Sequence, residues 1–127
     1  MSSVQGESGG GLQRSLIMLS KVVAVQVTDI PKGEIEELIL DDWKGTELSA
    51  ADKVLLESFP NLQFLSMNSC GLRSLNNFPL LPKLIKLELN DNKITGGLDK
   101  LAGMKDLMQI TLAGNQLRTL DAIQPLV

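Results

Sequence analysis

Side chains that most enzymes use for nucleophilic or metal chemistry are nearly absent from this sequence. The 127-residue chain holds no histidine and a single cysteine, Cys70. Serine and cysteine nucleophiles work with a neighbouring base, which is histidine in the common triads and dyads. Zinc sites draw most of their ligands from cysteine and histidine. We therefore expect no catalytic residue, no metal and no cofactor, and hence a protein that is not an enzyme.

The acidic side chains do not form a recognisable catalytic or metal-binding motif either. Two adjacent pairs, Glu36-Glu37 and Asp41-Asp42, stand in segments with the pattern of a strand. Neighbouring residues of a strand point to opposite faces of a sheet, so the two carboxylates of a pair do not converge. The run Asn90-Asp91-Asn92 lacks the spacing and the closing glutamate of an EF-hand calcium loop.

The charge of the chain argues against nucleic acid and membranes as direct partners. Its formal net charge is −3, whereas proteins that neutralise phosphates usually carry a basic patch. Its second half has lysines spread through expected loops with no interleaved aromatic residues, namely Lys83, Lys86, Lys93, Lys100 and Lys105. The apolar stretch 16–27 is interrupted by Lys21 and is too short to span a bilayer. Without a clear signal peptide or an internal disulfide, we expect a soluble intracellular protein.

The dominant pattern in the sequence is a repeat of its 24 leucines. Four segments follow L-x-x-L-x-L-x-x-N/C and start at Ile35, Leu62, Leu84 and Leu107, with Trp43 in the last position of the first segment. Successive starts lie 22 to 27 residues apart, which is the period of leucine-rich repeats. The sequence therefore predicts an α/β leucine-rich-repeat solenoid, a right-handed β-α superhelix with a short parallel sheet on its concave face.

Each repeat is expected to contribute one short strand to this sheet. The leucines of the L-x-L core point inward, and the alternating residues point to the concave face. The Asn or Cys that closes the motif turns the chain, and its side chain bonds backbone groups of the stacked loops. Cys70 holds such a position and has no basic neighbour within the motif, so we expect a structural thiol and not a reactive one.

The outward positions of the four strands form three columns across the predicted sheet. The columns are Glu37, Phe64, Lys86 and Gln109; Ile39, Ser66, Glu88 and Thr111; and Asp41, Asn68, Asn90 and Ala113. Exposed apolar groups at Ile39 and Phe64 among polar neighbours favour a protein-binding patch, although the same columns also suit an ordinary solvated sheet. The candidate partner-binding residues are Glu37, Ile39, Asp41, Phe64, Ser66, Asn68, Lys86, Glu88, Asn90, Gln109 and Thr111.

The chain is predicted to form one repeat domain over residues 12–127, preceded by a disordered Ser/Gly-rich segment at 1–11. Residues 12–34 would cap the first repeat. The spacing of Leu16, Leu19, Val23 and Val27 predicts a capping helix over 12–27, although its β-branched residues equally fit a strand.

Short helical pieces are expected between the strands. Ser49 and Asp52 form a capping box that predicts a helix to about residue 58, with Val54, Leu55 and Phe59 inward. Residues 72–83 are too short and too interrupted by Asn and Pro for a full helix, and a brief helix is predicted over 98–102.

A fifth repeat would start near position 129 or 130, beyond Val127. Residues 117–127 supply apolar side chains that lead into it but no polar cap, which a solenoid needs for solubility. We expect either an incomplete gene product or an end that is covered by self-association.

The third and fourth repeats resemble the acidic leucine-rich nuclear phosphoprotein family. The likeness is carried by LELNDNKITGGL at 87–98, LAGNQL at 112–117 and LDAIQPL at 120–126, and the first two repeats match at 36–41 and 64–66. The most distinctive pieces are the Gly96-Gly97-Leu98 turn and Ile123-Gln-Pro-Leu126. The likeness covers about residues 28–126. This sequence lacks the family's fifth repeat, C-terminal cap and acidic tail.

The resemblance implies a nuclear adaptor protein that shuttles with the cytoplasm. Members of the family bind histones, act in chromatin regulation and inhibit type 2A serine/threonine phosphatase. Their partner contacts lie on the concave face, which here would use Glu37, Asp41, Ser66, Asn68, Glu88, Asn90 and Thr111. The alternative is a structural component of a ribonucleoprotein particle, because a splicing-associated leucine-rich-repeat family has a similar layout.

Overall fold

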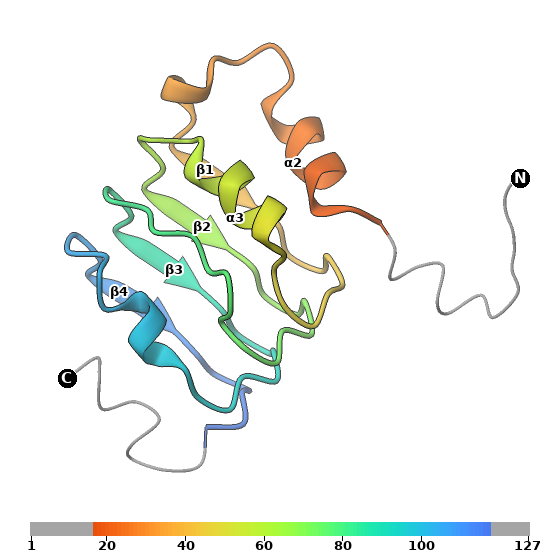
Figure 1. The fold of residues 1–127 in the computed structure, drawn as a ribbon, viewed down its shortest axis with the longest axis vertical. Helices are drawn as coiled ribbons and strands as arrows, with labels where there is room; N and C mark the ends of the chain where they lie inside the picture. Colours follow the sequence, from red (N-terminus) through yellow and green to blue (C-terminus); the bar gives the residue numbers. More distant parts are fainter. Residues whose placement is uncertain (1–16, 118–127) are drawn as a thin grey trace, which may run out of the picture.

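Four short strands, one from each L-x-L motif, organise the computed structural model of the chain, which describes residues 17–117. They are β1 (Glu37–Ile39), β2 (Phe64–Ser66), β3 (Lys86–Glu88) and β4 (Gln109–Thr111). The strands pair in parallel in the order β1-β2-β3-β4, so each lies beside the next strand of the sequence (Figure 1). The chain is therefore an α/β protein with a short parallel four-stranded sheet.

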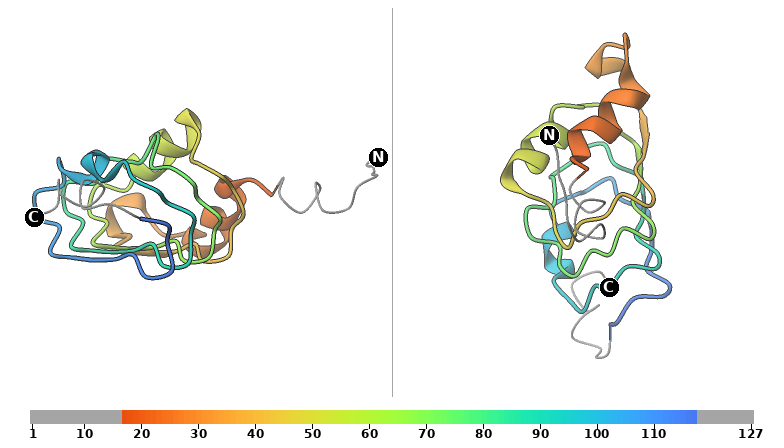
Figure 2. Two further views of the ribbon diagram at one scale, coloured as in Figure 1. Left: turned by 90° about the horizontal axis from the view of Figure 1, so that it is seen from below. Right: turned by 90° about the vertical axis from the view of Figure 1, so that its right-hand side faces the viewer.

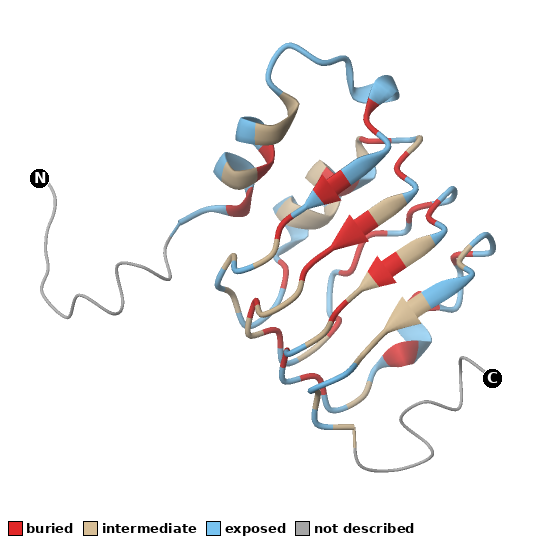
Figure 3. Cartoon of the chain, turned by 180° about the vertical axis from the view of Figure 1, so that it is seen from behind, coloured by how far each residue is buried: buried red, intermediate tan, exposed pale blue. Residues whose placement is uncertain are grey.

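The strand register places equivalent motif positions side by side, as the repeat predicted. Leu38, Leu65, Leu87 and Ile110 form the central row of the sheet. The three leucines are fully buried, whereas Ile110 in the edge strand β4 is half-buried. Figure 3 shows this difference between the inner strands and β4. Further leucines before and after each strand complete a single apolar core.

The helical segments lie on one side of the sheet and at one end of it. These are α2 (Leu19–Val27), α3 (Ala50–Glu57) and two 3-10 turns, η1 (Lys32–Glu34) and η2 (Leu98–Leu101). Figure 2 shows α3 and η2 together on one side of the molecule, with the sheet on the other side. Figure 1 places α2 beside β1. No helix between residues 17 and 117 is long and apolar enough to cross a membrane.

The capping box of α3 forms as predicted, but one inward residue was assigned wrongly. The Ser49 hydroxyl accepts from the Asp52 N–H at 3.0 Å, and the Asp52 carboxylate accepts from the Ser49 N–H at 2.9 Å. Val54 is 69% exposed, whereas Leu56 is fully buried together with Phe59. Leu56 and Phe59 are three residues apart and share one side of the segment, while Val54, two residues before Leu56, falls on the opposite side.

The predicted N-terminal helix is confirmed over Leu19–Val27 and covers the first strand. Leu19 and Val23 are buried, as their spacing predicted. Residues 17 and 18 are not helical, so within the described chain the helix begins at Leu19 and not earlier. The predicted disorder of 1–11, the helix over 12–16 and the apolar run of 118–127 lie outside the described residues. No helix forms over 72–83, and the 98–102 helix is the 3-10 turn η2.

A glutamine on α2 covers the open edge of β1. The side-chain carbonyl of Gln26 accepts from the Ile39 N–H at 2.9 Å, and its amide donates to the Ile39 carbonyl. Trp43, which departs from the Asn/Cys position of the motif, donates its indole N–H to the Ile17 carbonyl at 2.8 Å. An unpaired strand edge is a template for unwanted pairing, and these contacts occupy the edge from within the chain.

The Asn and Cys residues that close the motifs bond backbone groups, as predicted. Asn92 is 3% exposed and accepts from the Cys70 and Leu72 N–H groups at 3.1 and 3.0 Å. Its amide donates to the Met67 and Leu89 carbonyls at 2.9 and 3.0 Å. Asn115 repeats the arrangement one turn later. Its side-chain carbonyl accepts from the Ile94 N–H, and its amide donates to the Leu89 carbonyl.

Cys70 holds the corresponding position in the second repeat and is equally structural. Its thiol donates to the Leu40 carbonyl at 3.3 Å. Burial, assisted by the nearby negative charge of Asp41, raises the pKa of the Cys70 thiol to about 12. The thiol therefore stays protonated at neutral pH, and a reactive role is disfavoured because the thiolate is the nucleophile.

We expect the substitution Asn92→Ala to lower the free energy of unfolding by about 3 kcal/mol, because it leaves several buried backbone groups without a partner. Urea denaturation followed by far-UV circular dichroism measures the change. Asn76→Ala is the matched control, since Asn76 is exposed and its amide contacts the Glu47 carboxylate at the surface. It should change stability by no more than about 0.5 kcal/mol. Equal losses in both variants would contradict the structural role given to Asn92.

Candidate functional site

The predicted partner-binding residues lie on the side of the sheet away from α3 and η2, which we call the strand face. The register brings Glu37, Phe64, Lys86 and Gln109 into one row, and Ile39, Ser66, Glu88 and Thr111 into the next. Glu37 and Gln109 are exposed, and Ile39 is 37% exposed. The two predicted columns therefore exist as neighbouring rows on one face of the sheet.

Phe64 is not the exposed apolar group that the sequence suggested. It is half-buried, and the Lys86 ammonium lies 5.5 Å from the centre of its ring. The same ammonium pairs with a Glu88 carboxylate oxygen at 3.3 Å. Because a cation over an aromatic face is electrostatically attracted to it, Lys86 is held over Phe64 and Ile39 remains the exposed apolar group of the two.

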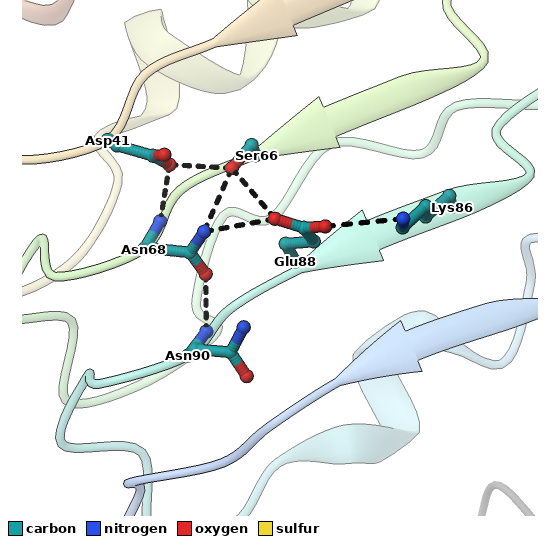
Figure 4. A network of polar contacts seen from close by, with 6 residues as sticks. All are labelled: Asp41, Ser66, Asn68, Lys86, Glu88 and Asn90. Carbon is teal, nitrogen blue, oxygen red and sulfur yellow. Dashed lines mark hydrogen bonds and ion pairs between the residues drawn. The ribbon is translucent and has the colours of Figure 1, made fainter.

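The third predicted column forms a ladder of hydrogen bonds that joins the four repeats. One oxygen of the Asp41 carboxylate accepts from the Asn68 N–H at 2.8 Å, and the Asn68 side-chain carbonyl accepts from the Asn90 N–H at 2.7 Å. The Asn90 side-chain carbonyl accepts from the Ala113 N–H at 2.9 Å. Figure 4 shows the first two steps. These side chains thus connect each turn to the next, a role that the sequence analysis missed although an Asx residue recurs there in three repeats.

Ser66 lies at the centre of this network and is only 2% exposed (Figure 4). Its hydroxyl donates to Asp41 at 2.6 Å and accepts from the Asn68 amide at 3.1 Å. The Asn68 amide also donates to Glu88 at 3.0 Å. The expectation that Ser66 faces outward for a partner is therefore wrong, because the longer polar side chains around it cover its short hydroxyl.

Hydrogen bonding stabilises the ionised form of Glu88. The bond from the Asn68 amide, with smaller contributions from Lys86 and Ser66, holds the pKa of the Glu88 carboxyl below its ordinary value. The Thr111 hydroxyl, in the same row on β4, is buried and has no hydrogen-bond partner in the described part of the chain.

The strand face carries an excess of negative charge. Its carboxylates are Glu37, Asp41 and Glu88, and its ammonium group is that of Lys86, which is already paired with Glu88. Within residues 17–117, no group of three Cys, Asp or Glu side chains gathers closely enough to hold a metal ion. This arrangement can complement basic groups of a partner protein, with Ile39 as an apolar contact.

Comparison with known proteins supports the resemblance drawn from the motifs. No protein-family model matches the sequence. The chain is 38% identical over 93 residues, 73% of its length, to the acidic leucine-rich nuclear phosphoprotein 32 family member A of Drosophila pseudoobscura pseudoobscura. It spans 34%, about a third, of that relative. The name of this relative describes a leucine-rich nuclear phosphoprotein.

We predict that Asn68→Ala raises the pKa of Glu88 towards the ordinary glutamate range, because the variant removes the largest hydrogen bond to the ionised carboxylate. A pH titration of side-chain carboxyl carbons by NMR measures this shift. Glu57 is an internal reference, since the Leu80 N–H holds its pKa low at a site that Asn68 does not touch. Asn76→Ala is the control variant and should leave Glu88 unchanged. An unaltered Glu88 pKa in Asn68→Ala would mean that the Asn68 amide is not the cause.

Proposed function

We propose that the chain is a leucine-rich-repeat module of the acidic nuclear phosphoprotein type that binds a basic segment of a partner protein on its strand face. The period of the leucines, the parallel order of the four strands and the similarity over 93 residues support a solenoid in which each strand begins a new turn. In such a solenoid the strand face is the concave surface, which repeat proteins commonly use for partners.

The observation that carries the proposal is the charge of the strand face. Three carboxylates face one ammonium, and the hydrogen bond from the Asn68 amide orients the Glu88 carboxylate and lowers its pKa. Fixed negative charges in an ordered network favour a Lys- or Arg-rich segment over an acidic one. Exposed Ile39 beside them supplies an apolar contact of the kind found at interface centres.

Among the partners that the family resemblance implies, histones fit this surface best. Their tails are rich in lysine and arginine, so their charge is opposite to that of Glu37, Asp41 and Glu88. A nuclear, non-enzymatic adaptor that shuttles with the cytoplasm and regulates chromatin is the corresponding cellular role. Inhibition of a type 2A phosphatase would use the same module, with the phosphatase in place of the histone.

We expect Glu37→Lys to weaken binding of a histone-tail peptide by about tenfold, because it converts an attractive contact into a repulsive one. Fluorescence anisotropy with a labelled tail peptide and the full chain measures the affinity. Asp99→Lys makes the same change of charge on η2, on the side of the sheet away from the strand face, and should change the affinity less than about twofold. Equal weakening by both variants would attribute binding to net charge alone. Capture of splicing proteins without histones or phosphatase subunits would favour the ribonucleoprotein alternative.

A further inference from the structure

We propose that the turns that follow the four strands form a second binding site, which takes an extended anionic segment of a peptide. Its anionic groups are phosphoryl groups or clustered carboxylates. The site is distinct from the strand face, carries the opposite charge and does not depend on the function proposed above. Three observations carry it: a pair of adjoining hollows, a rigid row of turns beneath them, and a set of cations without ion-pair partners.

The hollows lie across neighbouring turns. One, of about 470 Å³, is lined by Lys44, Arg73 and Lys93 together with glycine and threonine residues of the first two turns. The second, of about 430 Å³, shares Arg73 and Lys93 and adds Thr95 and Gln116. Because two residues line both, the hollows form one continuous depression, which we call the turn groove.

Backbone hydrogen bonds hold the floor of the turn groove in a fixed arrangement. The Gly45 N–H donates to the Cys70 carbonyl at 3.1 Å, and the Arg73 N–H donates to the Thr46 carbonyl at 2.7 Å. In the next turns, the Lys93 N–H donates to the Leu72 carbonyl at 2.7 Å, and the Gln116 N–H donates to the Ile94 carbonyl at 3.0 Å. Turns stacked in this way repeat at about 5 Å, like the strands that precede them, so the side chains of the groove are positioned before any ligand arrives.

The positive charge of the turn groove is available to a ligand. Lys44, Arg73 and Lys93 are exposed, and none of the three forms an ion pair with another residue in the range 17–117. Lys44 donates one hydrogen bond to the Ser69 carbonyl at 2.7 Å, which anchors it at the end of the groove. The guanidinium of Arg73 offers the fork of donors that suits phosphoryl and carboxylate oxygens.

Acidic residues border the turn groove but do not line it. Glu47 is engaged by the Ser74 hydroxyl at 3.0 Å and the Asn76 amide at 3.2 Å. Asp42 shares a separate, smaller hollow with Lys44. The centre of the groove, where Arg73 and Lys93 line both hollows, is thus its most cationic part and the place where we position the ligand's anionic group.

A glycine opens the groove at its middle. Lys44, Gly71, Lys93 and Gln116 each follow the residue that closes a motif, so they form one row across the turns. Gly71 adopts a φ of +85°, which glycine tolerates and which leaves no side chain between Lys44 and Lys93. An extended backbone can therefore cross the row at Gly71 while its anionic side chains reach the flanking cations.

The composition of the groove favours a peptide over a nucleic acid. Single-stranded nucleic acids are held by aromatic platforms together with a long basic track, and no aromatic residue lines either hollow of the turn groove. The surrounding protein is acidic overall, with a formal charge of −3. A short anionic segment satisfies the three cations without extending over the repelling surface beyond them.

Fluorescence anisotropy with three labelled peptides of one Gly/Ser framework tests the proposal on the full chain. One peptide carries phosphoserines, the second carries glutamates at the same positions, and the third is neutral. We expect the full chain to bind the phosphoserine peptide, the glutamate peptide or both, and not the neutral one, with an affinity that falls as salt is raised. The stronger of the two anionic peptides identifies the source of the charge. Equal binding of the neutral peptide, or tighter binding of a single-stranded DNA, would overturn the assignment.

Charge-reversed variants locate the binding. Arg73→Glu should lower the affinity for the anionic peptide by about tenfold or more, because it replaces a charge-assisted contact by repulsion. Lys105→Glu makes the same change of net charge at an exposed lysine before β4, at the other end of the strands, and should have an effect of less than about twofold. Glu37→Lys on the strand face should not weaken this binding, which separates the two sites. Equal losses of peptide affinity in Arg73→Glu and Lys105→Glu would overturn the proposal that the peptide binds in the turn groove.

Discussion

Strands of three residues leave most of the backbone of this protein outside the sheet, and backbone bonds between the turns, together with Asn and Asp side chains, supply the hydrogen bonds that the sheet cannot. Buried N–H and carbonyl groups need partners, and the turns after β2 and β3 are buried against each other. Asn92 alone satisfies groups from the second and third repeats. Asp41, Asn68 and Asn90 connect each of the four turns to the next, nearer the surface. Asx side chains therefore reinforce the register that the backbone bonds between neighbouring repeats set.

This constraint decides which polar residues are free for a partner. An oxygen that accepts a backbone N–H from the next turn is already used, and the Asn68 side chain uses its carbonyl and its amide within the network. Ser66 is enclosed by the same contacts. What remains toward solvent on the strand face is Glu37, Ile39 and Gln109, together with the Lys86–Glu88 pair and the half-buried Asp41 carboxylate, which accepts both of its hydrogen bonds on one oxygen. The functional surface is consequently narrower than the set of outward motif positions.

Spacing in the sequence predicts which element forms and which face a residue occupies, but not what covers that face. The repeat predicted all four strands and their register, and the Ser49–Asp52 box predicted α3. Phe64 was placed on the correct face, yet the Lys86 side chain lies over it, which no spacing rule contains. The contact between Gln26 and Ile39 was equally invisible, because it depends on how α2 docks against the edge of β1. Long side chains and docking angles are three-dimensional properties, and they account for the misjudged exposure of Phe64 and for the missed Gln26 contact, whereas Val54 was placed on the wrong side of its own helix.

The net charge of −3 conceals two ordered arrays of opposite sign. Because each repeat contributes one strand and one following turn, residues at one motif position line up across the molecule. Outward strand positions collect Glu37, Asp41 and Glu88, while the turns that follow the motifs collect Lys44, Arg73 and Lys93. A count of charges along the chain mixes the two arrays, and it therefore shows only a small net charge and scattered lysines. Counting the charges of strands and of turns separately distinguishes the two arrays, since stacking of the repeats, and not the place in the chain, determines which charges become neighbours.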